Sequence, residues 1–479
     1  MEPEAHSGGS RFVALLGGAV AVLGLGYLAV CVAGRASSRW PLEWMEGASV
    51  AHALRLLHGQ SLYAAPSGEF IPFVYPPLSY LPMALSVWLW GPELWAARVP
   101  SLLALFACAV ALGRAARHVS GGGGGGLLAA GLFGAGYGYG GGFVDLARVD
   151  AVFLALIAWG VERSCARQHG AALALCVLGC FAKQHAVFFL MAASAWALLD
   201  GGRAARRLVL GAWAGLGCGV LWLCYATDGW FWTYCVTVPG RHGLDARLLF
   251  SSLFVDLGVY LPVLCGLALY AVLRAERGRS PLTAAALFAI AGMVASALGR
   301  AHPGGDDNVR LPAFALLCVL AARGVTALCD GARTTARHAW VSALLSAQLA
   351  MLFQWPSLYG PRPEHAAYFE RLQRELTRCA AGEDAVAMDH ALLTARPFAH
   401  TLALSDLRMN DDALDVQATS AVLAVLQAED APSALAISVS FPALMQRLAE
   451  RYTLCTRLPA LRLPTGYALG PTYVYSRKP

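Results

Sequence analysis

Long apolar segments dominate this chain, and short polar connectors separate them. The first runs from Phe12 to Gly34, and ten more run over residues 93–117, 122–144, 150–163, 170–182, 184–199, 208–226, 251–273, 281–298, 311–329 and 340–355. An α-helix needs roughly 20 apolar residues to cross the hydrocarbon core of a bilayer. The pattern therefore predicts an all-α polytopic membrane protein with about eleven transmembrane helices. We interpret the first segment as a retained span, with a cleaved signal peptide as the alternative.

The basic connectors indicate how these segments are oriented. They hold Arg114 and Arg117, Arg163 and Arg167, Arg203 to Arg207, Arg274 to Arg279, and Arg333 and Arg337. An excess of Arg and Lys marks the cytoplasmic side, and all five clusters fall on one side if each segment crosses once. The apolar stretch from Pro77 to Trp90 must then be a juxtamembrane helix at the outer interface, where its aromatic side chains are favoured. The first outer loop spans residues 35–94 and holds a second short helix, from Met45 to His58.

Two other patterns in the helical part predict local structure. The short segments that meet at Lys183 predict a hairpin whose tip stops inside a protein-lined cavity. The glycines from Gly121 to Gly126 predict a helix start, and those from Gly134 to Gly142 a closely packed helix. No Lys-Ser or Lys-Thr pair follows the six consecutive glycines, which excludes a phosphate-binding loop.

The chain changes character after residue 355. Charge rises from Arg371 on, and the pattern predicts strands at 385–388, 434–439 and 473–476 and a helix at 442–452. We therefore expect a transmembrane domain over residues 1–355 and a small soluble α/β domain over residues 356–479 on the outer side. Cys379 and Cys455 lie in this tail, where a disulfide is an option if the tail is extracytoplasmic.

Composition agrees with a membrane location. The 479 residues are 57% hydrophobic and 14% charged, with a mean hydropathy of +0.54, values outside the range of soluble domains. The net charge of +6 is spread over short connectors and forms no single patch. Nucleic acid is therefore excluded as a partner, and membrane lipids are expected.

The first outer loop carries two carboxylates, Glu43 and Glu46. If the short helix predicted from Met45 to His58 begins by Trp44, the two carboxylates share one face at its N-terminus. The helix dipole favours the ionised form there, and an ionised carboxylate is what a general base needs. Both are candidate catalytic residues, and capping of the helix is the alternative role.

The other outer loops supply polar side chains suited to a phosphate and a sugar. Lys183 needs an anionic partner at the tip of two apolar helices, and that partner is either a lipid phosphate or an internal acid. The candidates are Asp145 and Asp150 for orienting an acceptor or a cation, Lys183, Arg148 and Arg241 for a lipid phosphate, and His302, Asp307 and Asn308 for sugar hydroxyls. Ion pairs within the loops, helix caps and turns are the alternatives. The spacing forms no metal signature, so a metal site remains unknown.

Several short motifs carry a resemblance to a known family. They are Glu43-Trp44-Met45-Glu46-Gly47, Leu56 to Tyr63, Tyr75-Pro76-Pro77-Leu78, Ala97 to Ser101, Ala147 to Asp150, Phe181 to Gln184 and Gly304 to Asn308. In this order they resemble the C-type (GT-C) membrane glycosyltransferases, in particular bacterial proteins similar to protein O-mannosyltransferases and the lipid A aminoarabinose transferase. The likeness covers about the first 355 residues.

The resemblance implies an inverting transferase in the bacterial inner membrane. It would move a sugar from a polyprenyl-phosphate donor to a lipid, glycan or protein acceptor on the extracytoplasmic face. The family places its catalytic carboxylate, usually Asp, in the first outer loop, where this chain has Glu43 and Glu46. Its second acidic position matches Asp145 or Asp150, and Lys183 is similar to its phosphate-binding cation. Some members use a divalent cation and others do not, so no cofactor is certain.

Two other functions remain open from the sequence. The charged residues Arg148, Asp150 and Lys183 also fit the binding site of a transporter or flippase for an amphipathic solute. No internal repeat accompanies them, and a soluble tail is unusual for a transporter. A catalytically silent protein that binds a glycolipid is the second alternative.

Overall fold

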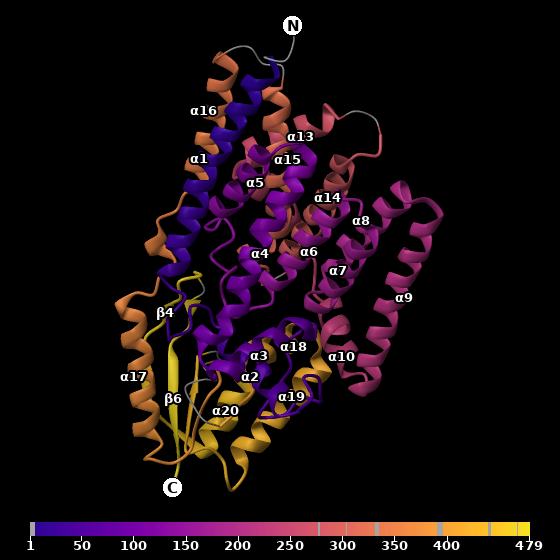
Figure 1. The fold of residues 1–479 in the computed structure, drawn as a ribbon. Coiled ribbons are helices and arrows are strands. Elements are labelled where there is room, and N and C mark those ends of the chain that lie inside the picture. The colour runs from indigo at the N-terminus through magenta and orange to yellow at the C-terminus, as the bar shows by residue number, and fades with distance from the viewer. Residues whose placement is uncertain are drawn as a thin grey trace.

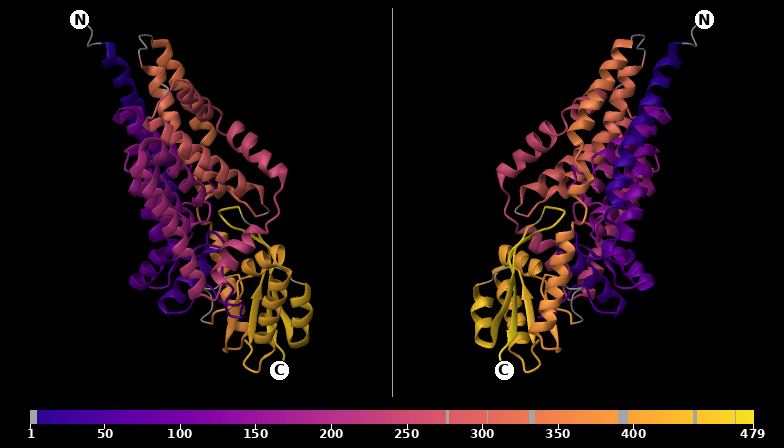
Figure 2. Two further views of the ribbon diagram at one scale, coloured as in Figure 1. Left: turned by 90° about the vertical axis from the view of Figure 1, so that its right-hand side faces the viewer. Right: turned by 90° about the vertical axis from the view of Figure 1, so that its left-hand side faces the viewer.

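The computed structural model describes residues 5–275, 278–302, 304–330, 335–389, 396–438, 442–466 and 468–479. A bundle of helices occupies one end of the molecule and a small α/β domain the other (Figures 1 and 2). The first described residues, from Ala5 on, lie at the end of the bundle away from the small domain, and the C-terminus lies within that domain. Arg277 and Arg333, two of the predicted basic connector residues, lie outside the described ranges.

Each predicted apolar segment contains a helix or a pair of helices. They are α1 (Ala5–Ala33), α4 (Leu94–Ser120), α5 (Gly123–Ala135), α6 (Asp150–Cys165), α7 (His169–Ala182), α8 (Ala186–Asp200), α9 (Gly202–Ala226), α12 (Ala246–Ser251) with the π-helix η3 (Ser252–Val259), α13 (Pro262–Leu273), α14 (Pro281–Ala301), α15 (Leu311–Cys329) and α16 (Thr335–Leu352). Among the described residues, five helices are long and apolar enough to cross a bilayer, or six if the pair bent after η3 counts as one span. The helical fold class is confirmed, whereas the count of eleven spans stays a prediction.

Glycines allow the helices to approach closely. A Cβ atom on Gly24 of α1 would lie 1.9 Å from the carbonyl oxygen of Gly131 on α5, so only glycine fits there. The expected helix over Gly134 to Gly142 is wrong beyond α5, which ends at Ala135 and is followed by turns. Gly142 has φ +68°, and a Cβ there would lie 2.8 Å from Arg35 Nη1. The glycines thus let an irregular backbone pass close to a buried arginine.

The segment predicted as one span over residues 251–273 is bent by 89° between η3 and α13. Pro262 opens α13 and cannot continue the helix before it. Gln348 of α16 accepts hydrogen bonds from the backbone N–H groups of Val263 (3.1 Å) and Leu264 (3.4 Å) and donates one to the Tyr260 carbonyl (2.9 Å). One buried amide therefore satisfies the backbone groups that the break exposes.

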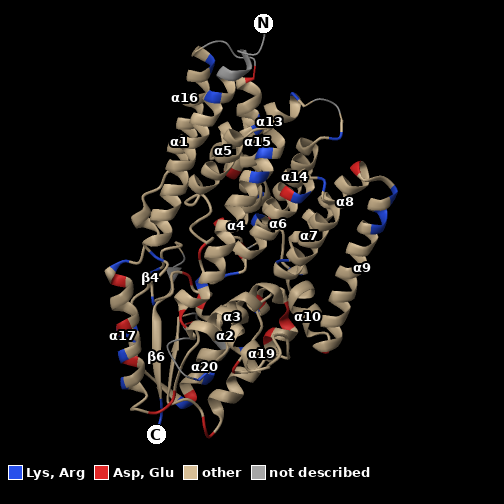
Figure 3. Ribbon diagram, in the orientation of Figure 1, with Lys and Arg blue, Asp and Glu red and all other residues tan. Residues whose placement is uncertain are grey.

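Short helices cover the end of the bundle that faces the small domain. They are α2 (Glu46–Leu57), η1 (Pro77–Ser79), α3 (Tyr80–Trp90), α10 (Trp230–Trp232), the π-helix η2 (Thr233–Thr237), α11 (Val238–Gly240) and η4 (Asp307–Arg310). On α3, Met83 is buried and Trp88 is exposed, as expected for a helix at an interface. Basic residues lie at those ends of α9, α13 and α16 that point away from the small domain (Figure 3).

The tail forms the predicted small α/β domain. Its elements are η5 (Pro356–Leu358), α17 (Pro363–Cys379), β1 (Ala385–Ala387), α18 (Thr401–Asn410), α19 (Asp412–Gln427), β2 (Ala434–Ile437), α20 (Pro442–Arg451), β3 (Tyr452–Leu458), β4 (Leu461–Arg462), β5 (Ala468–Leu469) and β6 (Thr472–Arg477). A sheet of order β1-β2-β6-β3 pairs β1 and β2 in parallel and the other neighbours antiparallel. Strand β3 was not predicted, and Val439 of the predicted second strand lies outside the described residues.

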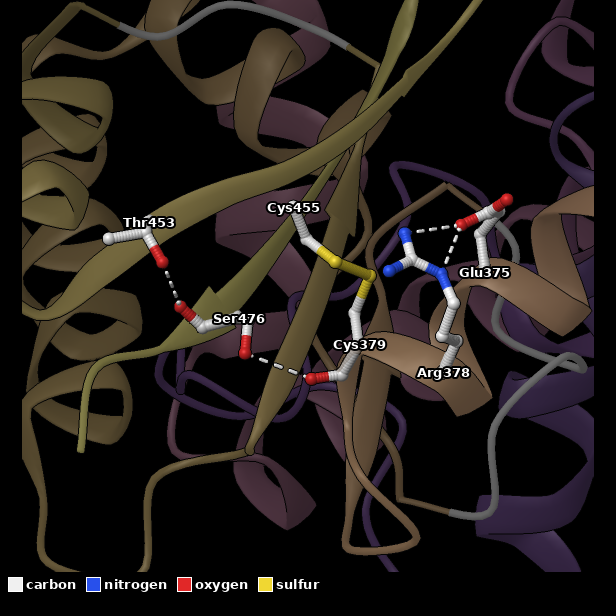
Figure 4. Close-up of a disulfide and its surroundings, with 6 residues drawn as sticks. All are labelled: Glu375, Arg378, Cys379, Thr453, Cys455 and Ser476. Carbon is white, nitrogen blue, oxygen red and sulfur yellow. Dashed lines mark hydrogen bonds and ion pairs between the residues drawn. A yellow bond between two sulfur atoms is a disulfide. The ribbon is translucent and has the colours of Figure 1, made fainter.

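A disulfide joins Cys379 at the end of α17 to Cys455 on β3 (Figure 4). The bond links the helix to the sheet that it covers, where Phe369 and Leu372 of α17 are fully buried. Both cysteines of the tail therefore take part in this disulfide.

Candidate functional site

Five of the predicted site residues form one continuous network, which we call the Glu43 cluster: Glu43, Arg148, Asp150, Lys183 and Asn308. Arg148 Nη1 lies 2.9 Å from Glu43 Oε1, and Arg148 Nε lies 3.1 Å from Asp150 Oδ2. Asp150 Oδ1 accepts hydrogen bonds from Lys183 Nζ (2.7 Å) and Asn308 Nδ2 (3.0 Å). Every one of these side chains is at least 90% buried. Four segments far apart in the sequence therefore meet at one desolvated site.

Local structure explains why Lys183 points into this cluster. It caps the C-terminus of α7 in an extended conformation (φ −155°, ψ 134°), and α8 begins three residues later. The predicted hairpin tip is thus confirmed, and the partner of Lys183 is the internal acid Asp150. The rings of Tyr75 and Phe153 each lie 5.9 Å from its ammonium nitrogen. A cation between two rings and one carboxylate retains donors for a further anion.

Glu43 precedes α2 instead of lying within it. The helix begins at Glu46 and not by Trp44, so the two glutamates do not share a helical face. Burial raises the pKa of Glu43 to about 7, because Arg148 and the Met45 N–H, which lies 2.8 Å from Oε2, offset only part of the cost of burial. A carboxyl group that titrates near neutral pH is suited to accept a proton.

Glu46 has a different environment, although it is only three residues away. Arg98 binds both of its carboxylate oxygens, at 2.7 and 2.8 Å, and the backbone N–H groups of Leu42 (2.8 Å) and Ala147 (3.1 Å) donate to them. Burial alone would raise the pKa of Glu46, but Arg98 and these donors hold it below its usual value. Its lone pairs are occupied by protein groups.

Arg98 was not among the predicted site residues. Its guanidinium donates to Glu46 and also to the carbonyl oxygens of Ser38 (2.7 Å) and Trp40 (3.2 Å), with longer bonds to Arg35 and Ala36 at 3.4 Å. The only signal for it in the sequence was its place in the Ala97 to Ser101 motif. Through these hydrogen bonds, Arg98 connects α4 to the start of the first outer loop.

The remaining predicted residues make their contacts elsewhere. Asp145 lies 3.2 Å from Arg35 and accepts a hydrogen bond from the Tyr137 hydroxyl. Arg241 is half exposed and pairs with Asp411, between α18 and α19. The remaining two are His302, which stacks on His242 with ring centroids 4.9 Å apart, and Asp307, which pairs with Arg310 at 2.8 Å. These four residues are not part of the Glu43 cluster.

One hollow adjoins the Glu43 cluster, and a second lies between the bundle and the small domain. A small cavity bounded by Asp150, Lys183, His185 and Asn308 has room for about one water molecule. A wider cleft of about 1260 Å³, open to solvent, separates the bundle from the β4–β5 turn of the small domain. Its lining includes Tyr139, Tyr260 and Tyr359, the arginines Arg310, Arg362 and Arg462, and Asp307. Within the described ranges, no three His, Cys, Asp or Glu side chains are grouped as metal ligands.

Solved structures share this fold. The crystal structure of ArnT from Cupriavidus metallidurans in the apo state superposes with a TM-score of 0.53 and 13% identity, over 98% of each chain. The same protein bound to undecaprenyl phosphate superposes with a TM-score of 0.50 and 14% identity, over 97% of this chain and 98% of that one. No family model matches the sequence, and no curated protein matches it.

The chain therefore has the fold of ArnT, and its long apolar helices are those of an integral membrane protein. The fold expected from the motif order is confirmed over nearly the whole chain, including the tail that the sequence resemblance did not cover.

Proposed function

We propose that this protein is a membrane glycosyltransferase that moves a sugar, with inversion, from a polyprenyl-phosphate donor to an acceptor on the extracytoplasmic face. The observation that carries the proposal is the Glu43 cluster. It joins a carboxyl group that titrates near neutral pH to two cations at the tip of a short apolar hairpin. The fold is shared with ArnT, one structure of which is bound to undecaprenyl phosphate.

The chemistry follows from the residues of the cluster. The acceptor hydroxyl oxygen attacks the anomeric carbon, and the bond from that carbon to the phosphate oxygen breaks. Polyprenyl phosphate leaves with the electron pair, and the acceptor proton passes to the Glu43 carboxylate. Attack on the face opposite the leaving group inverts the configuration.

Lys183 and Arg148 would hold the leaving phosphate. In the described contacts, Lys183 uses one of its three ammonium donors on Asp150, and the Arg148 guanidinium carries five donors. Asp150 would keep both cations in place, and their charge would offset the negative charge that develops on the leaving oxygen. A hairpin tip between apolar helices suits a donor whose lipid chain stays in the bilayer.

We assign the base to Glu43 and a structural role to Glu46. Four donors from Arg98 and the backbone saturate Glu46, whereas Glu43 is held by Arg148 and one backbone N–H. Asn308 is the strongest candidate for a sugar contact, since it joins the cluster directly. His302 and Asp307 remain proposals for the same role. Arg241 is no longer favoured as a phosphate ligand, because its guanidinium pairs with Asp411.

The proposed outer location has separate support. A disulfide persists in an oxidising compartment such as the periplasm, and basic residues lie at the other end of the bundle. A bacterial inner membrane fits both observations. The acceptor, whether lipid, glycan or protein, would enter through the cleft between the bundle and the small domain.

The test is reconstitution in liposomes with a panel of radiolabelled polyprenyl-phosphate sugars. Wild type should consume one donor, and Glu43→Gln should bind that donor with unchanged affinity while its turnover falls about 10²- to 10⁴-fold. The matched control is Asp145→Asn, which removes a buried carboxylate outside the Glu43 cluster. Turnover per folded molecule should be retained in this variant.

Other outcomes favour other functions. If the donor is bound and crosses the bilayer without being consumed, the protein is a flippase. If it is bound but neither consumed nor moved, the catalytically silent alternative stands. If no form binds any donor, the proposal is wrong.

A further inference from the structure

The segment that carries Glu43 has no regular secondary structure to hold it. Residues 41–45, which we call the Glu43 loop, lie between the end of the first helix and the start of α2 and form bends and turns. Position matters for a general base, because a displacement of about 1 Å can cost about 100-fold in rate. The groups that hold this loop therefore bear on the proposed reaction.

The helical part of the chain holds only some of the loop's groups. Glu46 accepts a hydrogen bond from the Leu42 N–H, Arg148 pairs with the Glu43 side chain, and Arg98 donates to the Trp40 carbonyl just before the loop. The carbonyl oxygens on either side of Glu43, those of Leu42 and Trp44, receive none of these bonds.

The small domain supplies those two bonds. The Thr465 hydroxyl, in the turn between β4 and β5, donates to the Leu42 carbonyl at 3.3 Å. His400 Nε2 lies 3.1 Å from the Trp44 carbonyl, and the imidazole ring packs against the Trp44 ring with centroids 5.9 Å apart. Glu43 thus lies between two residues whose carbonyl groups are held by a domain more than 350 positions further along the chain.

The protonation state of His400 suits this contact. Its Nδ1 accepts a hydrogen bond from the Leu402 N–H at 3.1 Å, at the start of α18, so the proton must lie on Nε2 and is donated to Trp44. Burial lowers the pKa of His400, which keeps the ring neutral. The same side chain therefore caps α18 and binds the loop.

The sheet fixes His400 in turn. Asp389, just after β1, accepts hydrogen bonds from the N–H and the hydroxyl of Ser438, just after β2, each at 2.6 Å. It also accepts one from the hydroxyl of Thr401, the residue next to His400. The carboxyl ends of parallel strands are where α/β domains usually bind ligands. In this chain, His400 lies beside that edge and contacts the Glu43 loop.

We propose that the small domain positions the proposed catalytic base, with His400 and Thr465 as positioning residues for Glu43. The inference rests on the proposed function for its effect on rate, but the restraint on the loop is testable without any substrate. It gives the small domain a role in the reaction itself, beside any part it has in admitting the acceptor.

Two substitutions of His400 separate the contact with the loop from the helix cap. His400→Asn retains a good capping side chain for α18 but is too short to reach Trp44. His400→Gln places an amide donor nearer that carbonyl while capping less well. We expect kcat to fall about 10- to 100-fold in His400→Asn and to recover in His400→Gln. The donor Kd should stay unchanged, because Lys183 and Arg148 keep their contacts with Asp150.

The pH profile adds a readout that general destabilisation would not move. The charged groups that act on Glu43 are Arg148 and Glu46, and its pKa is raised chiefly by burial. Once the loop is loosened, water reaches Glu43, so the acid limb of kcat should shift to lower pH in His400→Asn. Thr465→Val, which removes one hydroxyl, should shift it in the same direction by less.

The control is His365→Gln. His365 is another buried histidine of the small domain, and it contacts the backbone of Arg462 and Arg362 instead of the loop. It should lower the melting temperature of the small domain without a change in kcat or its pH profile.

Amide hydrogen exchange in the full-length protein tests the restraint alone. The Met45 N–H, which donates to Glu43, should exchange faster in His400→Asn than in wild type. If exchange at residues 42–46 and the kcat profile are both unchanged, the inference is wrong. If wild type consumes no donor yet exchange rises in His400→Asn, the proposed function fails and the positioning of the loop stands.

Discussion

Glu43 and Glu46 are three residues apart, both are buried and both pair with an arginine, yet their surroundings differ. Glu46 is bound by Arg98 and by two backbone N–H groups, and Arg98 also donates to backbone carbonyls of the first outer loop. Glu43 belongs to a cluster connected almost entirely through side chains, beside a small cavity. The Glu46 network holds backbone segments together. The Glu43 cluster connects side chains that can exchange partners.

This difference separates a structural carboxylate from a functional one. A carboxylate whose lone pairs all accept from the protein has no capacity left for a substrate proton, and breaking its network leaves buried charge unpaired. A side-chain cluster can give up one contact and gain a phosphate or a hydroxyl. The four predictions below test this distinction, from the largest expected effect to the smallest.

Removal of Arg98 should have the largest effect. Arg98→Met leaves the Glu46 carboxylate and several carbonyl groups buried without their donor, and truncation of one partner of a buried ion pair costs about 3–5 kcal/mol. We expect a lower melting temperature and little folded protein in detergent. If Arg98→Met melts at the same temperature as wild type, the Glu46 network is not structural.

Lys183→Met should act on donor binding. The substitution removes the cation while keeping an apolar chain between the rings of Tyr75 and Phe153, so the affinity for a polyprenyl phosphate should fall about 10- to 100-fold, as expected for one charge-assisted contact of about 1.5–3 kcal/mol. Isothermal titration with the unglycosylated lipid phosphate measures it. Equal affinity in the variant would remove Lys183 from the phosphate site.

The pH dependence of turnover should reflect Glu43. The base must be ionised, and burial raises its pKa to about 7, so kcat should be half-maximal near that pH and fall about tenfold for each unit below it. Arg148 lowers the pKa of Glu43, so Arg148→Gln should move the acid limb to higher pH. A profile that is flat from pH 5 to 8 would contradict the assignment of the base.

Arg241→Gln should have the smallest effect. Its pair with Asp411 is half exposed, and such pairs contribute about 0.2–1 kcal/mol. Donor affinity and turnover should match wild type within a factor of about two, while the melting temperature shifts slightly. A loss of donor binding as large as that of Lys183→Met would return Arg241 to the list of phosphate ligands.

Much of the architecture could be predicted because it depends on local pattern. Apolar length predicted the helices, the tip at Lys183 followed from two short segments, and the change in composition after residue 355 marked the small domain. The pattern failed where a break depends on distant partners. The bend after η3 relies on Gln348, and the turns after α5 pass close to Arg35 at Gly142.

The candidate site was predicted in its residue types but not in its pairing. The sequence by itself determined that acids and cations gather in the loops between apolar helices, because ionisable groups are excluded from the hydrocarbon. Only the tertiary structure decided that Glu46 is saturated, that Asp145 pairs with Arg35, and that Arg148, Asp150 and Lys183 meet at Glu43. It also decided that His400 and Thr465 reach the Glu43 loop from the tail. The physical reason is that hydrogen bonds and ion pairs act within about 3–4 Å, and spacing along a chain does not fix which distant groups come that close.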